Sequence, residues 1–146
     1  MTAAPSHPMG LKALGLATPL GSGKQTVADA LFEGTRAGLV IRDDLIPDSE
    51  IHVGAVPDAL PPIPETLAEY DCRNNRLMLA ALMEIAGDID AVKDRLGAHR
   101  IAIVLGTSTS GIAESEAAFA QYQKSGTWPA SYDFKMHEAG GLAEFA

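Results

Sequence analysis

Residues 100–111 read RIAIVLGTSTSG, and this stretch indicates the fold class more strongly than any other segment. Its first half, Arg100 to Leu105, is apolar nearly throughout and rich in β-branched side chains, which is typical of a central parallel strand. Its second half, Gly106 to Gly111, contains only glycine, serine and threonine. A helical pattern follows from about Ile112 to Lys124, so the stretch predicts a strand, a small-residue loop and a helix.

Strands and helices also alternate on the N-terminal side of this stretch. Leu11–Ala17 is a short apolar run that predicts a buried strand, and a turn at 18–21 ends it. Gln25–Glu33 has apolar residues at helical spacing, with Gly34 as the C-terminal cap. Ile51–Val56 alternates with a period of two, which predicts a half-buried strand after a brief extended segment near residues 38–41. Four prolines between residues 57 and 64 exclude regular structure there.

A long helix is the clearest prediction in the middle of the chain. Arg73–Ala86 has almost no polar face, so we expect it to be deeply buried, with Gly87 at its end. Asp88 is positioned to cap a second, amphipathic helix that runs through Leu96. After the helix that starts at Ile112, residues 126–129 break the pattern, and the tail has helical composition around residues 140–141.

Together these elements predict an α/β fold with a mostly parallel sheet and packed helices. We interpret residues 1–9 as a disordered lead and residues 10–146 as one domain or one half of a larger domain.

Composition excludes several classes of function. The formal net charge of −8 argues against a nucleic-acid partner, because phosphate binding needs a basic face. The four histidines are scattered and the single Cys72 has no metal-ligand spacing around it, so we expect no metal site and no cofactor. We interpret His99 and His137 as isolated residues. No apolar run approaches the roughly 18 residues of a membrane helix, and no signal peptide is apparent. A reducing, cytoplasmic location fits this pattern.

Gly21-Ser22-Gly23-Lys24 could be part of a phosphate-binding loop, since a strand precedes it and a helix follows. The spacing of that motif is wrong, because Thr18 stands where a glycine is needed and Gln25 where a serine or threonine is needed. A tight turn with a surface lysine is the alternative. Cys72, just before the long helix, is a candidate nucleophile without a histidine partner.

Three segments in the same order resemble the β-ketoacyl-carrier-protein synthases, a family with the thiolase fold. Residues 14–21, LGLATPLG, are similar to the family's opening GLGxVTPLG. Residues 30–39, ALFEGTRAGL, are similar to its ALxxGxSGI segment, with one extra residue. Residues 100–112 are similar to its RVGVVxGTxxGG strand and loop, and the helix from Arg73 resembles its long central helix. The resemblance runs from about residue 10 to the end, and it implies the N-terminal half of a layered α-β-α-β-α fold.

The resemblance implies a decarboxylating Claisen condensation between an acyl thioester and malonyl-carrier protein. In that family a cysteine carries the acyl chain and two histidines assist the decarboxylation. By this alignment the cysteine motif would begin about 20 residues after Ala146, so we expect no catalytic residue in this chain and no activity of the chain alone. Cys72 precedes the long helix and does not correspond to that cysteine.

The resemblance also implies binding residues. The loop that borders the family's acyl channel aligns with four residues here: Thr107, Ser108, Thr109 and Ser110. Thr109 stands where relatives often have an apolar gate. Arg73 and Arg76 align near basic positions that some relatives use to dock acidic acyl carrier protein, loaded with an acyl or a malonyl group.

Partners and rival functions follow from the same resemblance. Half of a layered fold exposes a sheet face, so we expect a homodimer or other self-association. One alternative is a non-catalytic ketosynthase-like subunit that pairs with an active synthase. The other is a phosphate-loop nucleotide-binding protein.

Overall fold

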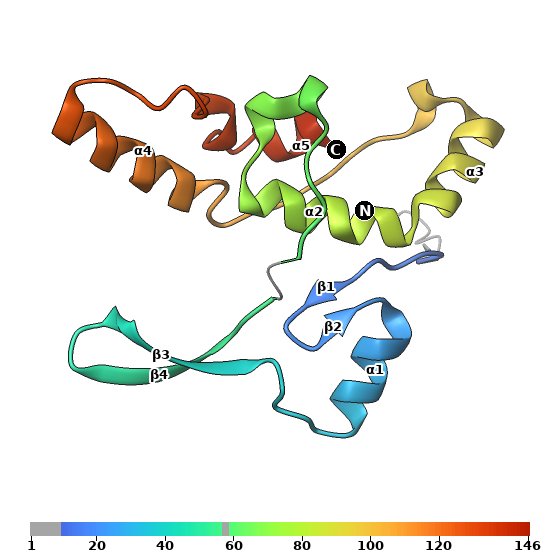
Figure 1. Ribbon diagram of the computed structural model, residues 1–146. Helices are drawn as coiled ribbons and strands as arrows, with labels where there is room; N and C mark the ends of the chain where they lie inside the picture. The colour runs from blue at the N-terminus through green and yellow to red at the C-terminus, as the bar shows by residue number, and fades with distance from the viewer. Residues whose placement is uncertain (1–9, 57–58) are drawn as a thin grey trace, which may run out of the picture.

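The computed structural model describes residues 10–56 and 59–146, so the lead at residues 1–9 and the first part of the proline-rich segment lie outside the described residues. A central pair of consecutive helices crosses the molecule, with a helical layer on one side of it and short strands on the other (Figure 1). No helix among the described residues is long and apolar enough to cross a membrane.

The N-terminal region forms a small hairpin and one helix. Strand β1 (Ala17–Thr18) pairs antiparallel with β2 (Gly21–Ser22), and helix α1 (Lys24–Phe32) follows directly. The helix ends as the sequence predicts, because Gly34 has a φ of 67°, a left-handed conformation that glycine adopts readily. The apolar run before β1 is not the predicted strand. Residues 11–16 form no strand, because no described segment pairs with them.

A second hairpin projects from the body of the molecule (Figure 1). Strand β3 (Leu39–Ile46) pairs antiparallel with β4 (Ser49–Gly54). The predicted strand at residues 51–56 is therefore confirmed with both bounds moved by two residues, to Ser49–Gly54, and the extended segment before it is longer than predicted. All eight residues of β3 are exposed, which is unusual because isolated two-stranded hairpins are marginally stable in water.

The central helices are α2 (Arg73–Glu84) and α3 (Ala86–Leu96). The break between them lies at Ile85, whose φ of −119° is not helical. The prediction that Gly87 ends the first helix was wrong, and so was the capping role of Asp88, which lies inside the first turn of α3 and makes no side-chain cap. Deep burial of the first helix was also wrong. Only Asn75 is buried in α2, because its apolar residues have few neighbours on the strand side.

The predicted central strand is extended but unpaired. Ile101 has φ −105° and ψ 128°, typical of a strand, yet residues 101–107 pair with no other described segment. Val104 is 90% exposed. Both strand pairs among the described residues are antiparallel, so a mostly parallel sheet is not present in this part of the chain. Extended backbone forms a sheet only where another strand supplies the hydrogen bonds.

The remaining elements form a helical layer over α2. They are the 3₁₀ segments η1 (Glu65–Tyr70) and η3 (Phe134–Met136), and the helices α4 (Ile112–Ser125) and α5 (Gly141–Phe145). A further 3₁₀ segment, η2 (Ala98–Arg100), lies apart from this layer against α3. Helix α4 confirms the predicted helix after the glycine-rich loop, and Gly126 ends it with a φ of 71°. Helix α5 confirms the helical composition of the tail.

The hydrophobic core lies where η1, α2 and α5 meet. Ile63, Tyr70 and Phe145 are buried together, and two half-buried leucines, Leu67 and Leu79, pack against them. The rings of Tyr70 and Phe145 lie 6.3 Å apart. The Tyr70 hydroxyl donates a hydrogen bond to Glu144 Oε2 at 2.9 Å, so its polar end is satisfied at the edge of the core.

Candidate functional site

The loop at residues 107–110 is held by one threonine hydroxyl. Thr107 Oγ1 donates to Asn74 Oδ1 at 3.2 Å and accepts from the backbone N–H groups of Thr109 and Ser110. Thr107 and Ser110 are half-buried, whereas Ser108 and Thr109 are exposed. Of the four predicted binding residues, Thr107 and Ser110 therefore hold the loop in place. Ser108 and Thr109 present their side chains to solvent.

Gly111 fixes the end of this loop between two other segments. Its N–H donates to the Met136 carbonyl at 2.8 Å. A Cβ atom at this position would come within 2.6 Å of that carbonyl oxygen and 2.9 Å of Cys72 Cβ. Only glycine fits here without displacing a neighbour. The loop, the start of α2 and η3 are thus in direct contact.

Cys72 lies at the N-terminal end of α2 and is 1% exposed. Burial raises the pKa of its thiol above the ordinary value, although backbone N–H groups at the helix start act in the opposite direction. The thiol is therefore protonated at neutral pH and inaccessible to a substrate. Cys72 packs beside Gly111 as a small apolar side chain, so its role in the structure is packing.

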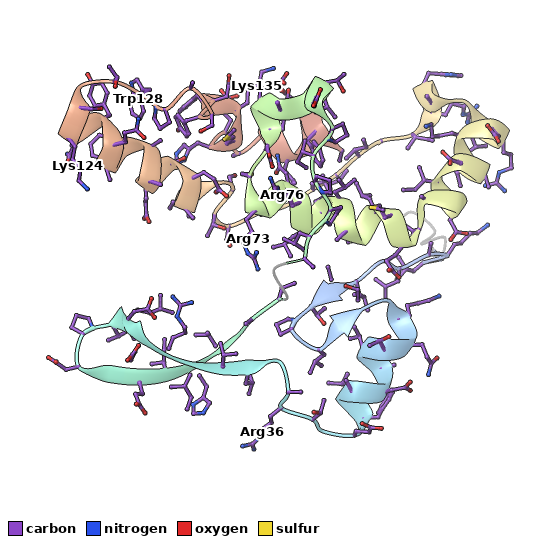
Figure 2. The ribbon with its side chains drawn as sticks, in the orientation of Figure 1. Arg36, Arg73, Arg76, Lys124, Trp128 and Lys135 are labelled. Atoms are coloured by element: carbon purple, nitrogen blue, oxygen red, sulfur yellow. The ribbon has the colours of Figure 1, made fainter. Side chains whose placement is uncertain are left out.

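The two arginines of the predicted docking site, labelled at α2 in Figure 2, both make hydrogen bonds within the chain. Arg76 forms a bidentate pair with Asp71, with distances of 2.6 and 2.7 Å, and this hydrogen bonding raises the pKa of the guanidinium. Arg73 donates to the Val56 carbonyl at 2.9 Å, and its own backbone N–H donates to Glu114 Oε1. Asn74, next to Arg73, binds Thr107. The structure thus places the predicted docking and substrate-binding residues at one end of α2.

A cluster of aromatic side chains beside α4 was missed by the sequence analysis. Trp128 stacks between Tyr122 and Tyr132, with ring centroids 4.7 and 5.6 Å away, and Phe119 lies 6.4 Å from it. Phe134 packs against His137. Five of the eight aromatic residues of the chain fall between residues 119 and 134. That concentration of aromatic residues, together with the helical spacing of Phe119 and Tyr122, could have predicted the cluster from the sequence.

His137 is not isolated, contrary to the prediction. Its Nδ1 lies 3.0 Å from Ser115 Oγ, and the Tyr132 hydroxyl donates to the same oxygen at 3.3 Å. The pair resembles a serine–histidine dyad in distance. However, the Ser115 hydroxyl donates its hydrogen bond to the Gly111 carbonyl at 2.9 Å. Its proton therefore does not point to His137, the residue that would have to accept it as the base. The cluster joins α4 to the turn at η3.

The phosphate-loop alternative does not fit the geometry. Gly21 and Ser22 belong to a β-hairpin strand, and the Gly23 N–H donates to the Leu16 carbonyl. The carboxylate of Glu84 lies against Gly23, where a Cβ atom would approach Oε2 to 2.9 Å. A carboxylate at the start of α1 occupies the place of a phosphate and repels a second anion. The described residues also contain no cluster of acidic, histidine or cysteine side chains suited to a metal ion.

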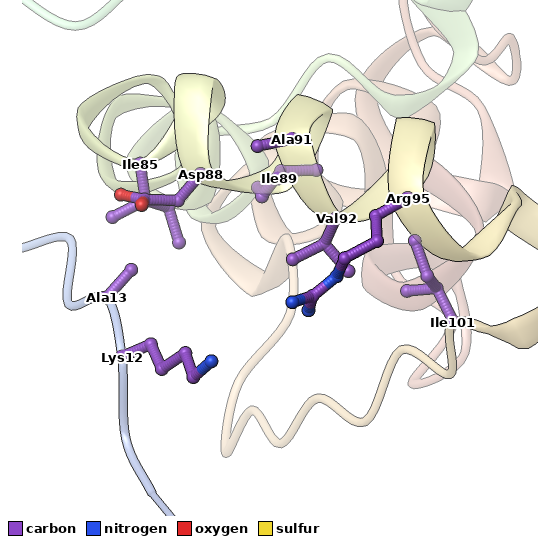
Figure 3. A pocket seen from close by; sticks show the side chains of 9 residues that line it. All are labelled: Lys12, Ala13, Ile85, Asp88, Ile89, Ala91, Val92, Arg95 and Ile101. Carbon is purple, nitrogen blue, oxygen red and sulfur yellow. The ribbon is translucent and has the colours of Figure 1, made fainter.

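An apolar groove lies between residues 12–13 and helix α3. It has a volume of about 440 Å³ and is lined by Ile85, Ile89 and Val92, with Ile101 at one end (Figure 3). Lys12, Asp88 and Arg95 border it. The groove separates residues 12–13 from α3 and from the start of the segment after η2.

Comparison with known proteins identifies the fold. One chain in the solved structure of the ketosynthase ApeO in complex with its chain length factor ApeC, from Xenorhabdus doucetiae, is 36% identical to this chain. The two superpose with a TM-score of 0.82 over 97% of this chain and 37% of that chain. No protein-family model matches the sequence, and no curated protein matches it. The chain has a ketosynthase-like, thiolase-like α/β fold and spans about a third of the length of the chain it resembles.

Proposed function

We propose that this chain is the N-terminal part of a 3-oxoacyl-carrier-protein synthase of fatty-acid or polyketide-type synthesis, acting in the cytoplasm. The observation that carries the proposal is the 36% identity to a chain of a ketosynthase complex over 97% of these residues. Identity at that level over almost the whole chain favours a related role and not only a shared fold. Of the segments that match the family motifs, the loop at residues 107–110 contacts the start of α2, and residues 14–21 lie against its other end, where Gly15 faces Ala81.

The proposed reaction joins two thioesters. An acyl group moves from carrier protein to a cysteine thiolate, and malonyl-carrier protein then loses carbon dioxide to give a carbanion. The carbanion attacks the acyl thioester, the 3-oxoacyl-carrier protein leaves, and the cysteine is regenerated. The cysteine and the two histidines belong, in this proposal, to sequence outside these 146 residues, because Cys72 is buried and protonated.

The residues of this chain would shape and position the substrate. The exposed hydroxyls of Ser108 and Thr109 would line the acyl channel, supported by the Thr107–Asn74 hydrogen bond. Arg73 and Arg76 would contribute a local basic patch for acidic carrier protein. Because the whole chain has a formal charge of −8, this contact would depend on local charge and not on long-range attraction.

Activity is tested with the protein that carries these residues, incubated with acyl- and malonyl-loaded carrier protein. We expect an acyl-enzyme mass adduct and a 3-oxoacyl product, with Thr109→Phe reducing turnover of long acyl chains more than that of acetyl. The 146-residue chain alone is the control and should form neither. No adduct and no product from the full protein would contradict the proposal.

Carrier-protein docking is a separate prediction. Replacing Arg73 and Arg76 by alanine should weaken binding of acyl carrier protein about five- to tenfold at low salt, since exposed charge contacts contribute about 1 kcal/mol or less each. Arg95→Ala and Arg100→Ala together are the matched control, because they remove the same charge from the other end of the central helices. Equal weakening by both double variants would show that only net charge matters.

A second candidate is a non-catalytic ketosynthase-like subunit that pairs with an active synthase. The similar solved structure favours this reading, since it contains a ketosynthase together with its chain length factor. The full protein would then form a stable heterodimer and raise product formation by its partner, while acquiring no acyl group itself. Intact mass spectrometry of both subunits during turnover distinguishes the two candidates.

A further inference from the structure

Three groups from outside the loop at residues 107–110 meet where that loop ends. The Ser115 hydroxyl oxygen lies 2.9 Å from the Gly111 carbonyl oxygen. The same oxygen lies 3.0 Å from His137 Nδ1 and 3.3 Å from the Tyr132 hydroxyl. Ser115 stands in the first turn of α4, whereas Tyr132 and His137 lie on either side of η3. These contacts therefore connect the end of the loop to a distant segment of the chain.

The positions of the protons follow from the chemistry of these groups. A hydroxyl has one hydrogen and two lone pairs, and a carbonyl oxygen can only accept. Because the Ser115 and Gly111 oxygens are 2.9 Å apart, the serine hydrogen must lie between them. Ser115 Oγ then accepts from the other two groups, one of which is the Tyr132 hydroxyl. The remaining donor is His137, which requires a hydrogen on Nδ1.

This arrangement fixes both backbone polar groups of Gly111, which is buried. Its N–H donates to the Met136 carbonyl at 2.8 Å, and its carbonyl accepts from the Ser115 hydroxyl. Met136 and His137 are neighbours in the chain. Residues 136–137 thus hold the Gly111 N–H directly and its carbonyl through Ser115, so the loop at residues 107–110 is anchored at its C-terminal end.

Ser110, the last residue of the loop, has a backbone conformation that depends on such an anchor. Its φ of 45° lies in the left-handed region, which residues other than glycine seldom occupy. Such a conformation persists only where the surroundings hold it. The Ser110 N–H donates to Thr107 Oγ1 on one side, and Gly111 is anchored on the other. Releasing the anchor would let Ser110 return to a negative φ and turn the exposed side chains of Ser108 and Thr109.

We propose that Ser115 and His137 are positioning residues for the loop at residues 107–110, acting through a hydrogen bond from His137 Nδ1–H to Ser115 Oγ. The inference rests on the proposed function, in which this loop borders the acyl chain. The two residues set the direction in which Ser108 and Thr109 face that chain. His137 lies at the surface, where water competes for its hydrogen bond, so the expected effects are modest.

Nuclear magnetic resonance of the full protein with ¹⁵N-labelled histidine tests the proton assignment without any substitution in the observed sample. At about pH 8, where an ordinary imidazole is neutral, His137 should give a protonated Nδ1 signal and an unprotonated Nε2 signal. The spectrum of His137→Phe identifies these signals by their loss. An unprotonated Nδ1 would show that the serine donates to the histidine, and would overturn the proposal.

Two substitutions of His137 separate hydrogen bonding from packing, because its ring also lies 5.8 Å from that of Phe134. His137→Asn keeps an N–H donor close to the position of Nδ1 but removes the ring. His137→Phe keeps a ring and removes the donor. We expect His137→Phe to lower the kcat/KM preference for the best acyl chain over a longer one about threefold to tenfold, the value of one net hydrogen bond. His137→Asn should retain most of the preference. The reverse order would assign His137 a packing role and overturn the proposal.

A matched pair of serines in α4 tests the other residue. Ser115→Ala should lower the same preference as far as His137→Phe does. Ser125→Ala is the control, because Ser125 also donates to the carbonyl four residues before it, that of Gln121 at 3.0 Å, but stands at the far end of the helix. It should leave the preference unchanged, and an equal loss in both serine variants would overturn the proposal. If Ser115→Ala does not fold by circular dichroism, the surface variants of His137 carry the test.

Amide hydrogen exchange of the full protein without acyl groups distinguishes failure of this inference from failure of the proposed function. His137→Phe should speed exchange at residues 107–111 about threefold to tenfold and leave α2 unchanged. If the full protein forms no acyl adduct but the loop responds in this way, the proposed function fails and the anchoring contact stands. An acyl adduct formed with unchanged chain preference in both His137→Phe and Ser115→Ala would overturn the positioning role, and unchanged loop exchange would overturn the anchor itself.

Discussion

Two parts of this molecule behave differently. In the helical layer, formed by η1, α2, α4, η3 and α5, side chains from distant positions meet in a core, such as Tyr70 and Phe145. In the strand region, formed by residues 10–54 and 101–105, the apolar side chains are mostly exposed, among them Leu11 at 84% and Val104 at 90%. Apolar residues are nevertheless common in the strand region, as residues 101–105 (IAIVL) show.

The difference lies in where the hydrogen-bond partners come from. A helix satisfies its backbone within its own segment, so α2 and α4 form wherever the local pattern favours them. A strand needs a neighbour from elsewhere in the chain or from another chain. The segment at residues 101–105 has the composition of a central strand and stays unpaired among the described residues.

The largest expected effect comes from emptying the core of the helical layer. Tyr70→Ala removes a buried ring, its hydrogen bond to Glu144 and the contact with the Lys135 ammonium, which lies 4.8 Å from the ring. We expect a loss of about 3–5 kcal/mol in the free energy of unfolding, measured by urea denaturation. In the strand region, Val104→Ala should change it by less than about 0.5 kcal/mol. Similar losses for both variants would remove the distinction between the two regions.

A smaller effect is expected where the loop meets the helical layer. Gly111→Ala places a methyl group against the Met136 carbonyl and Cys72, and should cost about 1–3 kcal/mol of unfolding free energy. Gly106→Ala is the matched control in the same loop, because its added Cβ would meet no atom within 4 Å. Equal effects of the two alanines would show that the loop is not held as described.

The smallest effect concerns pH. Burial raises the pKa of the Cys72 thiol in the folded chain, so the unfolded chain releases this proton first as pH rises. Stability from this group is therefore complete below the unfolded thiol pKa and is lost as pH rises through the folded value. We expect the unfolding free energy of Cys72→Ala to fall less between pH 8 and 10 than that of the original chain. A steeper fall for the variant would contradict the assignment.

Much of the helical layer could be predicted from the sequence. The spacing of apolar residues predicted α1, α2 and α4. Gly34 and Gly126 predicted two helix ends, and both adopt the positive φ expected there. The break at Ile85 was not predictable from the nearby Gly87, because it comes from one non-helical φ at Ile85, two residues before the glycine. The antiparallel pairing of β3 with β4 also depends on register, which the alternating pattern alone does not specify.

The site could be predicted less well. Motif resemblance singled out Arg73 and the loop at residues 107–110 as separate candidates. Their proximity at one end of α2 and the Arg76–Asp71 pair could not be predicted, because both require coordinates. The contact of His137 with Ser115 joins residues 22 positions apart, and no local pattern reports such a distance. The aromatic stripe was visible in the spacing of α4, although its exposure was not.

Amide hydrogen exchange of the 146-residue chain measures whether the extended segment at residues 101–105 is unpaired beside a stable helical layer. We expect slow exchange in α2 and α5, and exchange close to the unprotected rate at residues 101–105. Protection of residues 101–105 equal to that of α2 would show that this segment is already part of a sheet and would contradict the account.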